Sequence, residues 1–273
     1  MTEKKRRILT CIIAAVVVAV PFVCSCALEK TGYTIESDKI KGEVRLAFIS
    51  DLHNSRYGEN MRELVDAVRA YNPDAVVIGG DLYDEYWGEK NSDMLVERLA
   101  PEYKCFYTIG NHEKKRRDDD KIKEKLKEKG VTVLENNCSD LEIRGNRIRL
   151  TGLESMLYEE ECENVFSCVS PEYFNVLIHH YPEHFPDLSD KGFNLILAGH
   201  AHGGQIRIPF ILNGVYAPNQ GLFPEYTAGQ YSGSGTEMIV SRGLYRNFSN
   251  IAVPRVFNRP EIVFVTIEEK KAE

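Results

Sequence analysis

Short apolar runs that end abruptly at polar residues recur along the first half of the chain. Apolar positions in the intervening segments have helical spacing, as at Leu64, Val65 and Val68. The expected order of strand, helix, strand, helix and strand covers residues 44–50, 61–70, 75–78, 92–99 and 105–109. Strands that alternate with helices predict α/β units, in which ligands gather at the carboxyl ends of the strands.

The second half of the chain is richer in strands. Short strands are expected at residues 131–134, 141–143, 147–153, 175–178, 194–198, 237–240 and 261–267. Few helices separate them, so a second sheet packed against the first would accommodate them. The charged stretch 114–129 predicts a solvated helix in which Glu and Lys side chains are neighbours.

The N-terminus has the pattern of a targeting segment. Lys4 to Arg7 are basic and precede an almost unbroken apolar run from Ile8 to Val23. The run is short against the ~20 residues of a spanning helix, so a cleaved signal and a retained anchor both stay open for residues 1–27. Val23-Cys24-Ser25-Cys26 also resembles the lipobox of bacterial lipoproteins, with Cys26 in the acylated position. Either way, the rest of the chain is expected outside the cytoplasm.

Composition and charge indicate where the domain begins and ends and which kinds of partner are disfavoured. Residues 28–43 are polar and lack clear periodicity, which predicts a linker, so we expect one domain over 44–268 and a short tail over 269–273. The formal net charge is −7 and residues 3–7 contribute +3, so the remainder carries −10. Such an acidic body disfavours binding to long nucleic acids.

Four of the seven cysteines lie beyond the N-terminal segment: Cys105, Cys138, Cys162 and Cys168. They show no C-x-x-C spacing, which excludes zinc-ribbon and thioredoxin motifs. In an oxidising compartment Cys162 and Cys168, the nearest pair in sequence, are candidates for a disulfide. Buried thiols are the alternative, and the sequence leaves the choice open.

Short polar segments, here called islands, follow several of the expected strands, and six of the seven histidines lie in them. Asp51 and His53 are two residues apart, as are His200 and His202, a spacing that places both side chains of an extended chain on one face. These islands supply enough oxygen and imidazole ligands for two metal ions, and a dinuclear site favours phosphoester hydrolysis.

The island Gly110-Asn111-His112-Glu113 is informative in a different way. The side-chain carbonyl of Asn111 is a suitable ligand for a hard metal, and the adjacent imidazole of His112 would face the site without having to bind. An imidazole beside a metal is a candidate general acid or base.

Taken in order, the islands D-x-H, G-D, G-N-H-E, H-x-P and G-H-x-H-G-G resemble the calcineurin-like metallophosphoesterase superfamily. Gly199-His-Ala-His-Gly-Gly-Gln205, Ser241-Arg-Gly-Leu244 and Asn258-Arg-Pro-Glu-Ile262 are similar to its bacterial membrane-associated branch, which includes UDP-2,3-diacylglucosamine pyrophosphatase-like enzymes. The resemblance implies an α/β fold in which two β-sheets pack face to face with helices outside, a four-layer α/β/β/α sandwich.

The resemblance also implies a role for each motif residue. The first metal would be held by Asp51, His53 and His202. The second would be held by Asn111, His180 and His200, with the Asp81 carboxylate bridging the two ions. His112 would protonate the leaving oxygen, Asp84 would orient that histidine, and His179 would be buried or lie behind the ligands. Mixed imidazole and oxygen ligands suit Mn, Fe or Zn, and the sequence does not choose among them.

The leading hypothesis is a membrane-tethered phosphoesterase that hydrolyses a phosphodiester or pyrophosphate bond, with lipid-linked substrates as candidates. A nuclease or nucleotide phosphodiesterase with the same site, and a non-catalytic, metal-stabilised envelope binding protein, are the alternatives. Five aromatic residues either line an apolar approach to the site or are ordinary core and loop residues. They are Tyr83, Tyr86, Trp87, Phe210 and Tyr216.

Overall fold

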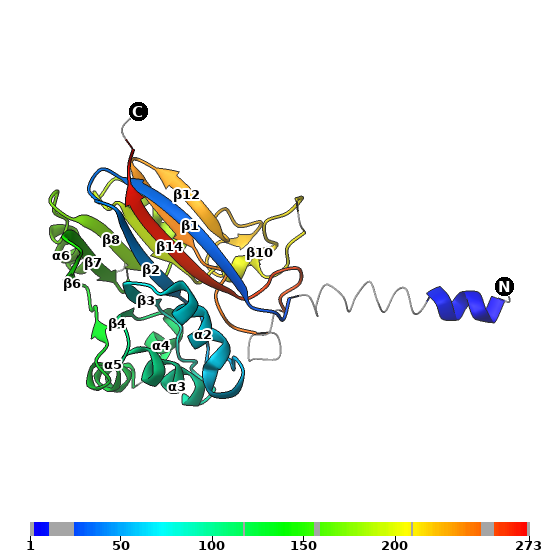
Figure 1. Cartoon of the computed structure of the whole chain (residues 1–273). Helices are drawn as coiled ribbons and strands as arrows, with labels where there is room; N and C mark the ends of the chain where they lie inside the picture. Colours follow the sequence, from blue (N-terminus) through cyan, green and yellow to red (C-terminus); the bar gives the residue numbers. More distant parts are fainter. Residues whose placement is uncertain are drawn as a thin grey trace.

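Two six-stranded sheets organise the computed structural model (Figure 1). The structure describes residues 3–10, 25–116, 118–155, 159–208, 210–246 and 254–271. The first sheet has the order β1-β14-β2-β3-β4-β5, and all its neighbours are parallel except β14 and β2. Its strands are β1 (Glu29–Ser37), β2 (Glu43–Ile49), β3 (Ala75–Gly79), β4 (Lys104–Thr108), β5 (Thr132–Val133) and β14 (Glu261–Glu269).

The second sheet has the order β12-β13-β9-β8-β7-β6. Its four central strands are parallel, while β12 and β6 pair antiparallel at the two edges. The strands are β6 (Cys138–Ile143), β7 (Asn146–Leu153), β8 (Phe174–His179), β9 (Leu195–Ala198), β12 (Gly229–Gly233) and β13 (Thr236–Val240). A separate two-stranded hairpin joins β10 (Tyr216–Ala217) to β11 (Gly221–Leu222).

The main core lies between the two sheets. Alternate residues of β2, such as Leu46 and Phe48, pack there against Val176 and Ile178 of β8. The intervening residues of β2 and β3 face outward and pack under helices. This division of each buried strand between two apolar layers explains why the strands are continuous apolar runs in the sequence.

Helices cover the outer face of each sheet. The first sheet is covered by α2 (Arg62–Tyr71), α3 (Lys90–Leu99) and α5 (Asp119–Glu128), and the second by α6 (Glu159–Ser167) and α7 (Phe185–Leu188). Shorter helices are α4 (Asn111–Lys115), η1 (Glu59–Met61), η2 (Pro182–His184) and η3 (His202–Gly204). The expected four-layer α/β/β/α sandwich is confirmed.

One boundary differs from the expectation. Most of the segment 28–43, predicted as a linker, forms β1 at the edge of the first sheet, parallel to β14. Every second residue of β1, including Tyr33 and Ile35, is at least half-buried, and the residues between them are exposed. The polar exposed face concealed this alternation in the sequence, so the domain begins earlier than residue 44.

The helical stretch predicted over 114–129 is divided. The end of α4 occupies its first residues, and α5 begins at Asp119, where Ile122 and Leu126 are buried against the first sheet. Most of the predicted signal or anchor lies outside the described residues. No helix among the described residues combines the length and the apolar character needed to cross a membrane.

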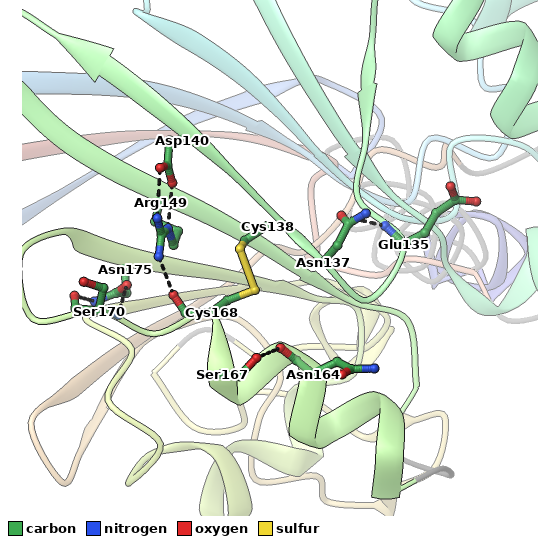
Figure 2. The surroundings of a disulfide bond; sticks show 10 residues. All are labelled: Glu135, Asn137, Cys138, Asp140, Arg149, Asn164, Ser167, Cys168, Ser170 and Asn175. Atoms are coloured by element: carbon green, nitrogen blue, oxygen red, sulfur yellow. Dashed lines mark hydrogen bonds and ion pairs between the residues drawn. A yellow bond between two sulfur atoms is a disulfide. The ribbon is translucent and has the colours of Figure 1, made fainter.

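A disulfide joins Cys138 of β6 to Cys168, which follows α6 (Figure 2). Their Cα atoms are 6.2 Å apart, within the usual range for a disulfide. The side chain of Arg149 donates a hydrogen bond to the carbonyl of Cys168 at 2.9 Å. The candidate pairing of Cys162 with Cys168 is therefore wrong, because Cys168 is bonded to Cys138 and Cys162 is a buried cysteine of α6 outside this disulfide.

Candidate metal centre

The predicted ligands all follow buried strands, and they meet where the carboxyl ends of the two sheets come together. Asp51 and His53 follow β2, and Asp81 follows β3. His180 comes directly after β8 in the other sheet, and His200 comes two residues after β9. The first and last of these elements are far apart in the chain, so the packing of the two sheets builds the site.

Asp81 lies at the middle of this group. Its Oδ2 is 3.6 Å from Nε2 of His53 and 3.1 Å from Nε2 of His180. Its other oxygen, Oδ1, accepts a hydrogen bond from the backbone N–H of His112 at 2.8 Å. One carboxylate oxygen is therefore fixed by the backbone, and the other faces imidazoles from both sheets.

Asp51 makes a similar connection. Its Oδ1 lies 3.6 Å from Nδ1 of His202 and 3.8 Å from Nε2 of His180. The backbone N–H of His200 donates to the same oxygen at 3.1 Å, and the hydroxyl of Ser50 donates to Oδ2. The two carboxylates and the imidazoles thus share one buried pocket.

Three overlapping groups have ligand atoms that all lie within 4.8 Å of one another. The groups are Asp51, His53 and His202; His53, Asp81 and His112; and Asp81, His180 and His200. The first group is the set expected for one metal, and the third contains two of the three ligands expected for the other together with the expected bridge. Asn111 lies on the wall of the same pocket.

Several buried polar atoms of this pocket have no hydrogen-bond partner among the described residues. They are Nε2 of His53, Oδ2 of Asp81, Oδ1 of Asn111, Nδ1 of His112, Nε2 of His180, both ring nitrogens of His200 and Nδ1 of His202. Nearly all buried polar atoms in proteins have a partner, so a cluster of exceptions indicates a ligand. Imidazole nitrogens and carboxylate and amide oxygens fit divalent transition metals.

In two of the candidate histidine ligands, the ring nitrogen that faces away from the site has a partner in the protein. Nδ1 of His180 donates to the carbonyl of Gly79 at 2.7 Å, and Nδ1 of His53 lies 3.1 Å from Oδ2 of Asp84. Partners of this kind fix the orientation of a metal-binding imidazole and direct its free nitrogen into the site.

Burial and neighbouring charges give the ionisable side chains of the pocket different protonation states. Burial lowers the pKa of His200 to about 3 and that of His202 well below its usual value. Burial opposes charge on His180 too, but the Asp81 and Asp51 carboxylates raise its pKa to about 10. Burial likewise disfavours ionisation of Asp81, yet His180 holds its pKa well below the usual value. His200 and His202 are therefore neutral beside an ionised carboxylate, the state that metal binding requires, whereas His180 would release its proton when a metal binds.

The backbone at the site is strained. Positive φ angles of 52° at Asp51, 46° at His53, 50° at Asp81, 63° at His200 and 48° at His202 place all five residues in the left-handed region. Non-glycine residues seldom adopt this conformation, and such outliers concentrate at functional sites. The turns after the strands thus impose these angles on five candidate ligands.

Two glycines allow this close packing. A side chain at Gly110 would overlap the carboxylate of Asp81, and one at Gly199 would overlap Ser50 and the Asp51 carboxylate. Both positions admit only a residue that lacks Cβ.

His112 stands at the open side of the pocket. Its side chain is 20% exposed, and its ring centroid is 4.5 Å from that of His53. Nδ1 of His112 is 3.6 Å from Oδ2 of Asp84, a longer separation than the 3.1 Å between Asp84 and His53. In this structure Asp84 therefore contacts His53 more closely than the histidine it was expected to orient.

The pocket opens into a cavity of about 290 Å³. Its lining combines candidate ligands with neighbouring residues: Asn111, His112, Lys115, Tyr181, His200, His202, Pro218 and Asn219. Lys115 also lines a second, wider cavity that contains Tyr86 and Trp87. Among the aromatics considered above, Tyr83 is buried and donates to Asp93, so it belongs to the core.

Glu113 has a structural role that the sequence analysis did not assign. This buried carboxylate accepts hydrogen bonds from the backbone N–H groups of Asp81, Tyr83 and Gly110 at 2.9, 2.9 and 3.0 Å. It therefore joins the turn after β3 to the turn after β4. In the sequence, the position of Glu113 in the Gly110–Glu113 motif was the sign that it lies near the site.

Asn258 is a second residue whose role was not anticipated. Its side-chain Nδ2 donates to the carbonyls of His202 and Gln205 at 2.7 and 3.0 Å, which fixes the η3 turn. The buried guanidinium of Arg255 in turn donates to the carbonyls of Tyr245 and Gly243 at 3.0 and 3.1 Å. His179 is buried, as expected, and Nδ1 donates to the carbonyl of Leu153 at 2.8 Å.

The comparisons with known proteins agree with this geometry. A family model described as calcineurin-like phosphoesterase matches residues 44–204, the span that contains every candidate ligand. The chain is a calcineurin-like phosphoesterase. It is therefore a metal-dependent phosphoester hydrolase, and the family uses two divalent metal ions.

Relatives of this phosphoesterase include the uncharacterized metallophosphoesterase YkuE of Bacillus subtilis, 28% identical over 88% of this chain and 86% of that protein. The phosphodiesterase YaeI of Escherichia coli is 27% identical over 82% of each chain. Among solved structures, TT1561 of Thermus thermophilus aligns with 73% of this chain and 89% of its own, at 10% identity and a TM-score of 0.49.

Proposed function

We propose that this phosphoesterase hydrolyses a phosphodiester or pyrophosphate bond in a lipid-linked substrate, on the extracytoplasmic side of a membrane. The observation that carries the hydrolytic part is the set of unpartnered, buried ligand atoms that converge beside a cavity of about 290 Å³. A cavity of this size admits a phosphoryl group and part of its substituents.

The proposed metal ligands agree with the first and third groups described above, with Asn111 added from the wall of the pocket. Asp51, His53 and His202 would hold one ion; Asn111, His180 and His200 would hold the other; and Asp81 would contribute to both. The position of Oδ2 of Asp81 between His53 and His180 supports its shared role. Two bound divalent ions would make a water molecule nucleophilic near neutral pH and neutralise charge on the phosphoryl oxygens.

His112 is the proposed general acid. It lines the cavity, is partly exposed, and has a ring nitrogen without a hydrogen-bond partner among the described residues. The proton it supplies would go to the leaving oxygen as the phosphorus–oxygen bond breaks. Asp84, 3.6 Å from Nδ1 of His112, would stabilise the protonated ring while it also holds His53.

Two features support a location outside the cytoplasm. The apolar run Ile8–Val23, with its basic flank, is typical of a signal or an anchor. The disulfide between Cys138 and Cys168 belongs to oxidising compartments and is rare in the cytosol. A membrane-attached enzyme meets lipid-linked phosphoesters directly, and the motifs after residue 199 resemble those of diacylglucosamine pyrophosphatase-like enzymes.

A comparison of leaving groups tests the role of His112. We expect manganese-dependent hydrolysis of a bis-aryl phosphodiester by the wild type, and a much smaller rate for a diester with an alkyl leaving group. His112→Gln should lower the rate with the alkyl leaving group by about 10²–10⁴. The aryl rate should fall less, because an aryl oxide needs no proton to leave. Metal content, measured by elemental analysis, should stay unchanged.

The same experiment separates the alternatives. Equal losses for both leaving groups would assign His112 to positioning instead of proton transfer. Metal binding without turnover of any diester would favour a non-catalytic binding protein. Preference for cyclic nucleotides or oligonucleotides over nucleotide-linked and simple phospholipids, in a parallel substrate screen, would favour the nucleotide phosphodiesterase or nuclease alternative.

A further inference from the structure

The segment between η3 and β12 exposes several large apolar side chains. Phe210 is fully exposed, and Ile211, Leu222 and Phe223 are 82%, 69% and 68% exposed. Single apolar residues on a surface are ordinary, but contiguous groups mark interaction sites. The arrangement of these side chains therefore decides whether they have a role.

Backbone contacts hold this segment in one compact unit. Ile208 forms an isolated β-bridge with Leu212, and β10 pairs with β11. The backbone N–H of Phe223 donates to the carbonyl of Val215 at 2.9 Å, which joins the two turns. The exposed apolar side chains therefore belong to neighbouring turns of a folded segment.

Phe257 extends this surface from another part of the chain. It is 44% exposed, and its neighbour Val256 forms a β-bridge with Ile206 at the start of the segment. On the other side of Phe257, the backbone N–H of Asn258 donates to the hydroxyl of Ser25 at 3.1 Å. We name Ile208, Phe210, Ile211, Leu222, Phe223 and Phe257 the apolar rim.

The apolar rim thus begins where the N-terminal segment enters the domain. Ser25 is buried next to the rim and comes two residues after the apolar run Ile8–Val23. Figure 1 shows the β10 hairpin and the start of β1 on the same side of the domain. A membrane that holds the apolar run therefore lies close to the rim.

Charge distinguishes this segment from the rest of the surface. Charged residues make up 27% of the chain, yet none occurs from Ile208 to Pro224. An uncharged apolar surface beside an apolar N-terminal run matches the interfacial region of a lipid bilayer.

We propose that the apolar rim rests on the lipid bilayer, as a second contact besides the N-terminal segment. The turn between β10 and β11 carries Pro218 and Asn219, which line the metal cavity. Docking of the rim therefore brings the mouth of the cavity to the membrane surface, where the phosphoryl groups of lipids lie. This membrane contact can be measured without any enzymatic turnover. An experiment can therefore refute the contact without refuting the proposed hydrolysis, and the reverse.

Fluorescence quenching by brominated lipids tests this contact. The full chain, with Trp87→Phe to remove its single tryptophan, receives either Phe210→Trp or Lys121→Trp. Lys121 is exposed on α5, so it serves as the matched control. Each variant is reconstituted with vesicles of phosphatidylcholine and phosphatidylglycerol, with and without bromine on the acyl chains.

The N-terminal segment tethers both variants equally, so a difference between them reports the contact of the rim. We expect bromination to reduce the emission of the Phe210→Trp variant at least twofold more than that of the control. Adding Ile211→Asp should abolish most of this difference. Equal quenching of the two variants would overturn the proposal. So would a dimer in detergent that dissociates on Phe223→Asp, because the rim would then face a second copy.

Discussion

Asn258 donates a hydrogen bond from Nδ2 to the carbonyl of His202, 56 residues earlier in the chain, at 2.7 Å. Both residues are buried, and φ at His202 is 48°. This bond therefore holds a candidate ligand in a backbone conformation that is unfavourable by itself. The motif near the end of the chain thereby stabilises a turn that the motif at residues 199–205 cannot maintain alone.

Asn258→Ala should weaken the binding of one metal by about 10–100-fold, the usual effect of losing a group that positions a ligand. His202 belongs to one metal group only, so the second ion should remain at near-full occupancy. Isothermal titration of the metal-depleted protein with Mn²⁺ measures both steps. Asn213→Ala, at an exposed asparagine of the same half of the chain, is the control and should leave both steps unchanged.

Asp81→Asn should lower the occupancy of both metals together, because Oδ2 of Asp81 lies between His53 and His180. The amide keeps the size of the side chain but supplies less negative charge. Activity on a bis-aryl phosphodiester should fall by at least about 10²-fold, since the ions provide the nucleophile and the charge stabilisation. Elemental analysis that finds one ion fully retained would contradict a bridging role.

Lys115→Ala should raise KM for phosphodiesters about tenfold and change kcat less. Lys115 lines the cavity beside the candidate ligands, where an ammonium attracts the phosphoryl oxygens of the substrate. An interaction made equally with substrate and transition state changes KM alone. Its neighbour Lys114 pairs with Glu154 at 3.4 Å and is the control, since Lys114→Ala should leave KM unchanged. A larger loss in kcat than in KM would instead place Lys115 in the chemical step.

Much of the site could be predicted from the sequence because its residues follow buried parallel strands. Such strands are apolar on both faces, so the first ionisable side chain after each one lies close to its carboxyl end. Asp51, Asp81 and His200 occupy such positions. Helical periodicity located α2 and α3 for a similar reason, since each buries one apolar face against the first sheet.

The unpredicted features depend on contacts between distant segments. β1 pairs with a strand at the other end of the chain, and its polar exposed face conceals the period of two at Tyr33 and Ile35. The disulfide partner of Cys168 is set by the position of β6, not by closeness in sequence. The hydrogen bonds of Asn258 exist only after both sheets have packed.

Cys138→Ser should lower the free energy of unfolding by about 3.6 kcal/mol, the value expected when a loop of this length is no longer closed in the unfolded chain. The two cysteines are 30 residues apart in sequence. Urea unfolding measures the change, and a reductant should destabilise the wild type to the same extent. Cys168→Ser should match Cys138→Ser, and the double variant should show no further loss. Reductant sensitivity that persists in Cys138→Ser would point to a different disulfide.

The position of β14 has a consequence for how the molecule is made. This strand lies between β1 and β2, which precede it by more than 200 residues in the chain. The edge strand β1 therefore cannot pair within its sheet until residues 261–269 have been synthesised. Because pairing between segments so far apart in the sequence is slow, we expect the first sheet to be completed in a late step of folding.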